Sequence, residues 1–250
     1  GWRWTYASAA ILVGVTLIPA TLWLLSNHHH FHRRYLSQLS SQGDSVASNA
    51  VSWTRGQVLR DVRFYVMAPG ILSSPMIVTA FFLHHLNVAD AKGWSGEWIT
   101  GAYIFYALAG IITVLLAGPL IDRIRAQRVI QIMLIPLMGA CFMLATADRA
   151  FWVIPYMIMM GLHTGLIHTS ASALWAELYG PQHLGAIKSL YLALMVFASA
   201  VGPVVMGMLM DAGLSIYQVC SVFGAFIAVG AVLIVLALRM KPAPPDIVSA

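Results

Sequence analysis

Seven long stretches without a single Asp, Glu, Lys or Arg constrain this chain more than any other feature. They run from Thr5 to Leu25, Phe64 to Leu83, Trp98 to Ile121, Val129 to Ala147, Ala150 to Ala176, Leu190 to Met210 and Leu214 to Leu238. A helix needs about 20 apolar residues to cross the hydrocarbon of a bilayer. A charge at the centre of such a helix costs roughly 2.5 to 3.5 kcal/mol on insertion. The pattern therefore predicts an all-α membrane protein with seven transmembrane helices.

The composition argues against a nucleic-acid partner, which the positive charge would otherwise favour. Of the 250 residues, 60% are hydrophobic and 9% are charged, and the formal net charge is +5. The basic residues are scattered through short loops and form no stripe with interleaved aromatic residues, so no nucleic acid is expected. The expected partner of the apolar stretches is the lipid bilayer.

The loops differ in their content of basic residues, and this difference predicts the orientation. One set of loops carries Arg33, Arg34, Arg55, Arg60, Arg63, Arg123, Arg125, Arg128, Lys188, Arg239 and Lys241, and the other carries Arg3, Lys92 and Arg149. Lys and Arg are enriched on the cytoplasmic side of membrane proteins. We therefore expect Gly1 outside and the C-terminal tail in the cytoplasm. Short loops without large extracytoplasmic domains favour a bacterial inner membrane.

The longest connection is polar and separates one leading helix from a group of six. We expect residues 1–25 to be the last helix of an N-terminal half and residues 26–63 to be a cytoplasmic interdomain linker. Residues 64–239 would form a six-helix half, and residues 240–250 a cytoplasmic tail. In such a six-plus-six arrangement the chain is a fragment, and its further partners are the preceding helices of the same protein.

A motif lies in the loop between the third and fourth stretches. It reads Gly118-Pro119-Leu120-Ile121-Asp122-Arg123-Ile124-Arg125. The order of Gly, three residues, Asp and Arg resembles the signature G-x-x-x-D-R/K-x-G-R-R/K of the major facilitator superfamily, which joins the second and third helices of each half. The match departs at residues 125–127, which read Arg-Ala-Gln where the signature has Gly-Arg-Arg.

Two further segments resemble the same family. Residues 1–4 (Gly-Trp-Arg-Trp) are similar to the start of its sixth helix, and residues 176–180 with Gly185 to the loop after its tenth. Halves of this family contain inverted triplets of helices, and Gly118-Pro119 and Gly202-Pro203 occupy corresponding positions in the two triplets. The resemblance covers essentially the whole chain and implies a secondary transporter.

The resemblance also implies a latch that closes the cytoplasmic side. The Asp122 carboxylate would cap the positive end of a helix from the opposite half. Arg123 or Arg125 would pair with Glu177. The alternative is that these residues are loop charges that set the topology and contact lipid headgroups.

Candidates for a substrate site must be weakly polar groups, because no span carries a charged side chain. The resemblance implies that the first and fourth helices of this half line the central cavity. Our candidates there are Ser73, Ser74, His163, Thr164 and His168, from a wider pool that also holds Thr79, Tyr156, Ser170 and Ser172.

The helical period separates the two histidines of the fourth helix. At about 100° per residue, Thr164 and His168 share a small and polar face with Gly161 and Gly165, whereas His163 points about 140° away from His168. An ionisable group inside a span is a functional candidate by default, so His168 is favoured for a role in the cavity. The alternative is a helix-packing seam, because small residues let helices approach closely.

These observations predict transmembrane transport of a small organic solute by alternating access, with a proton as a candidate coupling ion. The alternative class is a seven-helix receptor or sensor, although a retinal-type protein would need a Lys in its last span, which has none. An enzyme is not expected, because the spans lack acids and a convergent metal set. Residues 28–32, which hold four histidines, and the pair His84-His85 fall on opposite sides of the membrane, so neither a metal nor another cofactor is expected. An isolated metal site at residues 28–32 is the alternative to a solvated cluster.

Overall fold

The computed structural model describes residues 2–26 and 52–240 and divides into two compact units, residues 1–50 and 51–250. The described residues form helices and contain no strand. Among the described residues, seven helical segments are long and apolar enough to cross a membrane: Arg3–Trp23, Val62–Leu83, Gly96–Ile124, Ala126–Thr146, Ala150–Tyr179, Leu184–Asp211 and Ile216–Arg239. The predicted all-α membrane fold with seven spans is confirmed.

The first unit contains one described element, helix α1 (Trp2–Ser26). Its sequence is apolar on every side after Arg3, as expected of a membrane span rather than of an amphipathic surface helix. Pro19 lies inside the helix, a position that membrane helices tolerate.

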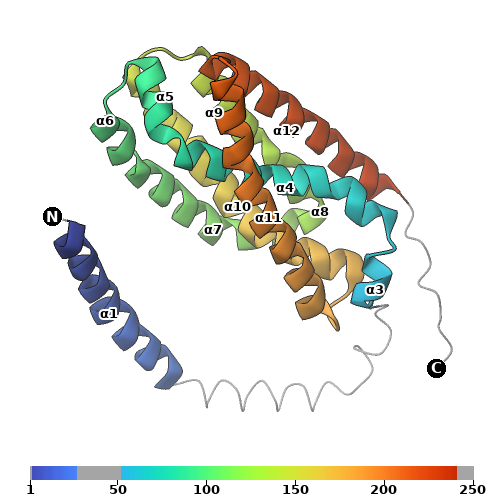
Figure 1. Cartoon of the computed structure of the whole chain (residues 1–250). Coiled ribbons are helices and arrows are strands. Elements are labelled where there is room, and N and C mark those ends of the chain that lie inside the picture. Colours follow the sequence, from blue (N-terminus) through green and yellow to red (C-terminus); the bar gives the residue numbers. More distant parts are fainter. Residues whose placement is uncertain (1, 27–51, 241–250) are drawn as a thin grey trace. The chain divides into compact units, whose positions relative to one another are not determined.

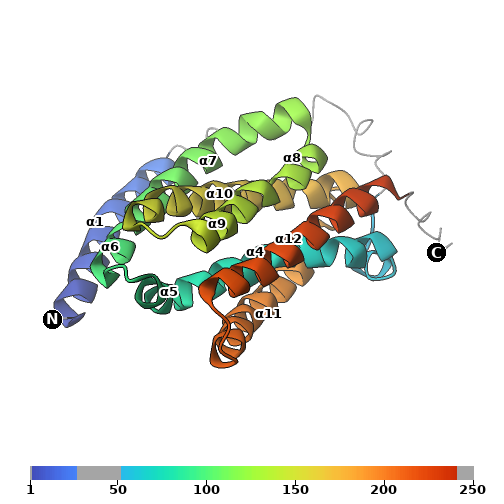
Figure 2. The same ribbon diagram turned by 90° about the horizontal axis from the view of Figure 1, so that it is seen from above.

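The second unit is a bundle whose helices are coloured from cyan to red in Figures 1 and 2. They are α3 (Arg55–Val58), α4 (Val62–Leu83), α5 (His85–Lys92), α6 (Gly96–Gly101), α7 (Tyr103–Ile124), α8 (Ala126–Ile132), α9 (Leu134–Thr146), the short 3-10 helix η1 (Ala150–Trp152), α10 (Val153–Tyr179), α11 (Leu184–Asp211) and α12 (Ile216–Arg239). Three of the spans consist of two consecutive elements, since α6 leads into α7, α8 into α9 and η1 into α10. α5 continues α4 beyond the length that a span requires.

The long helices of the bundle form two consecutive triplets, α4–α7–α9 and α10–α11–α12, and the first helix of each triplet packs against the second and third helices of the other. α4 packs against α11 and α12, and α10 packs in the same way against α7 and α9. α9 and α12 also pack against each other. Since the start of α4 lies against the end of α10, as the hydrogen bond between Tyr179 and Asp61 requires, the two triplets run in opposite directions. This is the geometry of an inverted repeat.

Glycines allow the closest helix pairs. A methyl group added to Gly161 or Gly165 of α10 would meet α7, for instance at 2.9 Å from the Cβ of Ala109 and 2.6 Å from the Cβ of Thr113. Gly202 of α11 lies in the same way against the backbone of α4. The glycine side of the small face on α10 is therefore a packing seam, as one of the two interpretations of the sequence expected.

We name the two ends of the bundle by an acidic residue at each. The Asp61 end contains the starts of α4, α8 and α11 and the ends of α7, α10 and α12. At the opposite, Asp148 end, side chains from the α5–α6 region donate to backbone carbonyls beyond α9. Trp94 Nε1 donates to the carbonyl of Asp148 at 2.8 Å, and Lys92 Nζ donates to that of Ala147 at 3.0 Å. These bonds hold the α5–α6 region against the loop between α9 and η1.

Candidate functional site

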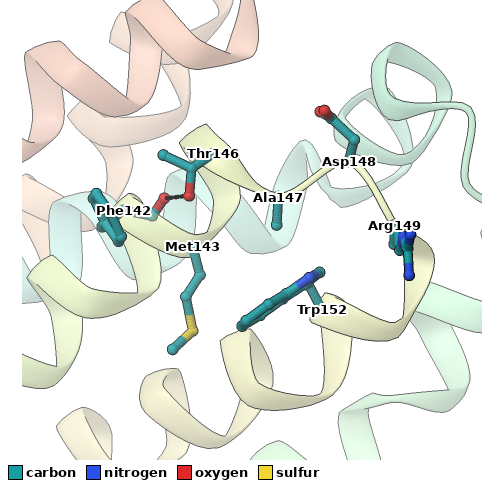
Figure 3. Close-up of a pocket in the computed structure, with 7 residues that line it drawn as sticks. All are labelled: Phe142, Met143, Thr146, Ala147, Asp148, Arg149 and Trp152. Atoms are coloured by element: carbon teal, nitrogen blue, oxygen red, sulfur yellow. Dashed lines mark hydrogen bonds between the residues drawn. The ribbon is translucent and has the colours of Figure 1, made fainter.

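One hollow is a surface gap at the Asp148 end, with a volume of about 550 Å³. It lies between the last turn of α9 and η1, and Figure 3 shows Met143 and Trp152 facing it while the Asp148 carboxylate points away. The hydroxyl of Thr146 is bonded to the carbonyl of Phe142 at 2.9 Å. A binding site for a polar solute requires polar groups that converge. The polar groups around this hollow do not converge.

A better candidate lies between α4, α7, α10 and α11, which we call the central groove. It consists of two adjoining hollows of about 340 and 370 Å³ that share Tyr106, Thr164 and His168. The polar side chains that line it are Ser74, Thr79, Tyr106, Thr164, His168 and Ser199. The remaining lining is aliphatic or aromatic, with Phe82, Ile167 and Leu192 among it. An apolar groove with a few polar groups is the usual form of a site for a small organic molecule.

His168 is the most accessible of the candidate polar residues. Its side chain is exposed and borders both hollows. It makes no hydrogen bond to another described residue, so both ring nitrogens can reach a solute or water. Thr164, one turn earlier, borders the same hollows and donates from Oγ1 to the carbonyl of Met160 at 2.9 Å.

His163 lies outside the groove, in the core of the bundle. It is completely buried. Its Nδ1 lies 2.7 Å from the carbonyl oxygen of Met133, and its Nε2 lies 2.6 Å from Oγ of Ser74. The imidazole therefore connects α10 to α4 and to the junction of α8 and α9.

The neighbouring candidates Ser73 and Ser74 have different surroundings. Ser74 lines the groove. Ser73 is completely buried and donates to the carbonyl of Gly70 within α4 at 2.7 Å. Of the five candidates, His168, Thr164 and Ser74 meet in the groove, whereas His163 and Ser73 do not reach it.

The loop motif forms one of the expected interactions within the chain. Glu177 accepts a hydrogen bond from the backbone N–H of Ala126 at 2.9 Å and so caps the start of α8. Its other oxygen lies 3.9 Å from Nε of Arg125, whose side chain is 69% exposed. Arg123 and Asp122 are exposed and make no ion pair or hydrogen bond with any described residue.

Arg125 stands where the backbone favours glycine. It has φ 71° and ψ 148°, and it is the only described non-glycine residue with positive φ. Residues other than glycine rarely adopt this backbone conformation. The position is the one at which the family signature has Gly, so the departure in the sequence coincides with a strained residue.

A second group of charges at the Asp61 end did not stand out in the sequence. The linker-end cluster consists of Trp53, Asp61, Arg63 and Tyr179. Asp61 and Arg63 are 2% and 7% exposed. Their side chains meet through Nε of Arg63 at 2.9 Å and Nη2 at 2.8 Å from Oδ2 of the carboxylate. Asp61 also caps α4 by accepting from the backbone N–H of Arg63 at 3.0 Å.

Aromatic residues enclose this ion pair. The Tyr179 hydroxyl donates to Oδ2 of Asp61 at 3.0 Å. The backbone N–H of Trp53 donates to the backbone carbonyl of Tyr179 at 2.8 Å. The guanidinium carbon of Arg63 lies 5.7 Å from the ring centroid of Trp53 and 5.8 Å from that of Tyr179, within the range of cation–π attraction. In the sequence, this cluster corresponds to the pattern Asp61-x-Arg63 at the start of a helix. The comparison of basic residues between the two sets of loops counts Arg63 only as a loop charge.

The described residues contain no group of three or more His, Cys, Asp or Glu side chains that could hold a metal ion. His84 and His85 bond to backbone carbonyls instead, at 3.1 Å from Pro203 and 2.7 Å from Phe82. The histidines of residues 28–32 lie outside the described part of the chain.

The comparison with known proteins identifies a family. A family model described as Major Facilitator Superfamily matches residues 1–162 and 98–249, two overlapping segments that together span nearly the whole chain. No curated protein is a significant match.

Proposed function

Because the chain belongs to the major facilitator superfamily, we propose that it carries a small organic solute across a membrane by alternating access. The chain is an integral, multi-pass membrane protein of a transporter family, whose members bind small-molecule substrates. The family match does not favour the alternative of a seven-helix receptor or sensor. The proposed activity is movement of a solute without a chemical reaction.

The central groove is the observation that carries this proposal. It brings Ser74 of α4 together with Thr164 and His168 of α10. These two helices are the first members of the inverted triplets, and carriers built from inverted repeats bind their substrates at the interface of the repeats. The groove is lined without Asp, Glu, Lys or Arg, so polarity and shape would select the solute on this side.

His168 is the proposed link to a coupling proton. Imidazole changes charge between about pH 5 and pH 8, and His168 is the one titratable imidazole that borders the groove. Binding of the solute and of the proton can therefore be coupled at one residue.

We also propose that the Asp61 end faces the cytoplasm of a bacterial cell and that residues 26–63 link two halves of a carrier. The basic residues Arg55 of α3, Arg128 of α8 and Lys188 near the start of α11 support this orientation. In this arrangement Asp122 and Arg123 remain available for a helix of the other half. Residues 52–61 pack on the six-helix unit, and Trp53 is 5% exposed there, so this part of the linker would stay with α4–α12.

The orientation can be tested by labelling single cysteines in intact cells after Cys141 and Cys220 have been replaced by Ala. Position 148 is the suitable site for the outside, because the Asp148 side chain is 94% exposed and that of Lys92 only 10%. We expect a membrane-impermeant maleimide to label Asp148→Cys and not Arg60→Cys. Labelling of Arg60→Cys from outside would reverse the orientation.

Transport can be tested with the full-length carrier in proteoliposomes, by screening uptake of radiolabelled organic acids, amines and polyols. We expect His168→Ala to lower the affinity or the rate for any solute that is carried. His183→Ala is the matched control, since His183 is exposed but lies in the loop before α11. Equal transport by both variants and the parent would remove the groove from the proposal.

His168→Gln separates hydrogen bonding from proton uptake, because the amide bonds to a solute but does not titrate. Retained uptake with a flattened pH profile would indicate a proton role. Retained uptake with the parental profile would leave only a role in hydrogen bonding.

A further inference from the structure

One hydroxyl group of the central groove has an unusual partner. A serine inside a helix ordinarily donates to a carbonyl of the preceding turn, and Ser73 does so with Gly70. Ser74, its neighbour, makes no such bond to a described residue. Its Oγ lies instead 2.6 Å from Nε2 of His163. The direction of this bond decides what Ser74 offers to the groove.

The direction follows from the other side of the imidazole. Nδ1 of His163 lies 2.7 Å from the carbonyl oxygen of Met133. A carbonyl only accepts hydrogen bonds, so Nδ1 carries a proton. The ring is completely buried, and residues 64–83, 98–121, 129–147 and 150–176, which form the helices around it, contain no Asp, Glu, Lys or Arg to balance a charge. A buried charge without a partner is strongly unfavourable, so the ring is neutral and Nε2 has no proton.

A bare Nε2 can only accept, and Ser74 must therefore donate its single hydroxyl proton to it. The lone pairs of Ser74 Oγ are then what remains for the groove. We propose that His163 is a positioning residue that makes Ser74 an obligatory hydrogen-bond acceptor toward the central groove, so that the carried solute presents an O–H or N–H group there. The inference rests on the proposed function, in which the solute binds in this groove.

Two other hydroxyl groups of the groove, those of Thr164 and Ser199, are oriented alike. Thr164 donates to Met160 at 2.9 Å, and Ser199 donates to Val196 at 2.7 Å. Each therefore also turns lone pairs, and not its proton, toward a ligand. Three acceptors from α4, α10 and α11 thus line a groove without charged side chains, which favours a solute with several donors over one with acceptors alone.

The tautomer is tested without any solute by solid-state NMR of the full-length carrier, labelled with ¹⁵N-histidine and embedded in lipid. The spectrum of His163→Gln, subtracted from that of the parent, assigns the two ring signals. We expect the chemical shift of a protonated nitrogen for Nδ1 and of an unprotonated nitrogen for Nε2. A proton on Nε2 overturns the inference.

The preference for donors is tested with matched pairs of probes. Lactate differs from propionate by a hydroxyl group, and N,N-dimethylglycine differs from glycine betaine by an N–H group. We expect the donor-bearing member of a bound pair to bind about three- to tenfold more tightly in calorimetry, the value of one ordinary hydrogen bond. Equal affinity within a bound pair overturns the inference, and if no probe binds, the Nε2 signal decides alone.

Variants test which residues cause the preference for donor-bearing probes. Ser74→Ala and His163→Leu should lower the affinity ratio within a pair. Ser73→Ala is the matched control and should keep the ratio. His163→Gln, whose amide can donate to Met133 and accept from Ser74, should restore part of it. If His163→Leu does not fold, Ser74→Ala still decides, because a retained ratio in that variant contradicts the proposal.

The two proposals fail in different ways. A carrier that transports a solute while Nε2 of His163 is protonated contradicts this inference and leaves the transport function intact. A carrier with a bare Nε2 that moves no solute of the screened classes contradicts the proposed function instead.

Discussion

Two groups of charged residues lie at the Asp61 end of the bundle, and the protein holds them in opposite ways. In the linker-end cluster, Asp61 and Arg63 are buried, bonded to each other and enclosed by aromatic rings. In the loop motif, Asp122 and Arg123 are exposed and make no bond to a described residue, and Arg125 reaches Glu177 only at 3.9 Å.

The difference reflects where each group finds its partners. A buried charge must be satisfied inside the unit that buries it, because removing one partner leaves the other uncompensated. Exposed charges are hydrated and contribute little to stability, so they can pair with a group outside this unit. The linker-end cluster is therefore expected to govern stability, and the loop motif to govern transport.

The largest expected effect is that of Asp61→Ala. It leaves the Arg63 guanidinium buried without its carboxylate and removes the cap of α4, so we expect a loss of about 3–5 kcal/mol in the free energy of unfolding. Reversible unfolding of the full-length carrier in mixed micelles measures it. Asp122→Ala is the matched control and should unfold with the parent. Equal effects of the two substitutions would abolish the distinction between the groups.

Tyr179→Phe should have the next largest effect. It removes the hydroxyl that donates to the Asp61 carboxylate at 3.0 Å, and a hydrogen bond to a charged group contributes about 1.5–3 kcal/mol. Tyr191→Phe provides the control, because Tyr191 is also buried but its hydroxyl makes no bond to a described residue. A loss that is no greater for Tyr179→Phe than for Tyr191→Phe would show that the cluster is held by packing alone.

Arg125→Gly should act in the opposite direction. Glycine relieves the strain of φ 71°, an effect on the order of 1 kcal/mol, and gives up only an exposed pair with Glu177. We therefore expect a slightly higher melting temperature. Arg123→Gly, in the last turn of α7 and two residues away, should lower it, because glycine in a helix costs up to roughly 0.5–1 kcal/mol. A lower melting temperature for Arg125→Gly would mean that the ion pair outweighs the strain.

Asp122→Asn should have the smallest effect on stability and a clear effect on transport. The substitution retains the size of the side chain and removes the charge that the proposed latch needs. We expect unchanged insertion and unfolding but a lower transport rate and a shifted distribution of inward and outward states, measured by accessibility of single cysteines in the groove. A parental rate with a parental distribution would make Asp122 a loop charge alone.

Hydropathy by itself determined the membrane architecture of this protein. Segments without charge must be long enough to cross the bilayer, and this property is local to each segment, so all seven spans could be located from the order of residues alone. The loop signature, with Asp122 and Arg123 at the required spacing, is equally local and led to the correct family. Composition also led us to expect that weakly polar groups would line the groove.

The tertiary structure decided which polar residues meet. Ser73 and Ser74 are neighbours in the sequence, yet one bonds within α4 and the other to His163, because the rotation of each helix in the bundle determines which side chain faces the groove. Likewise Asp61 and Tyr179 are separated by more than a hundred residues and form one hydrogen bond. Rotations and partners of this kind depend on how all helices pack at once, and no local pattern in the sequence specifies them.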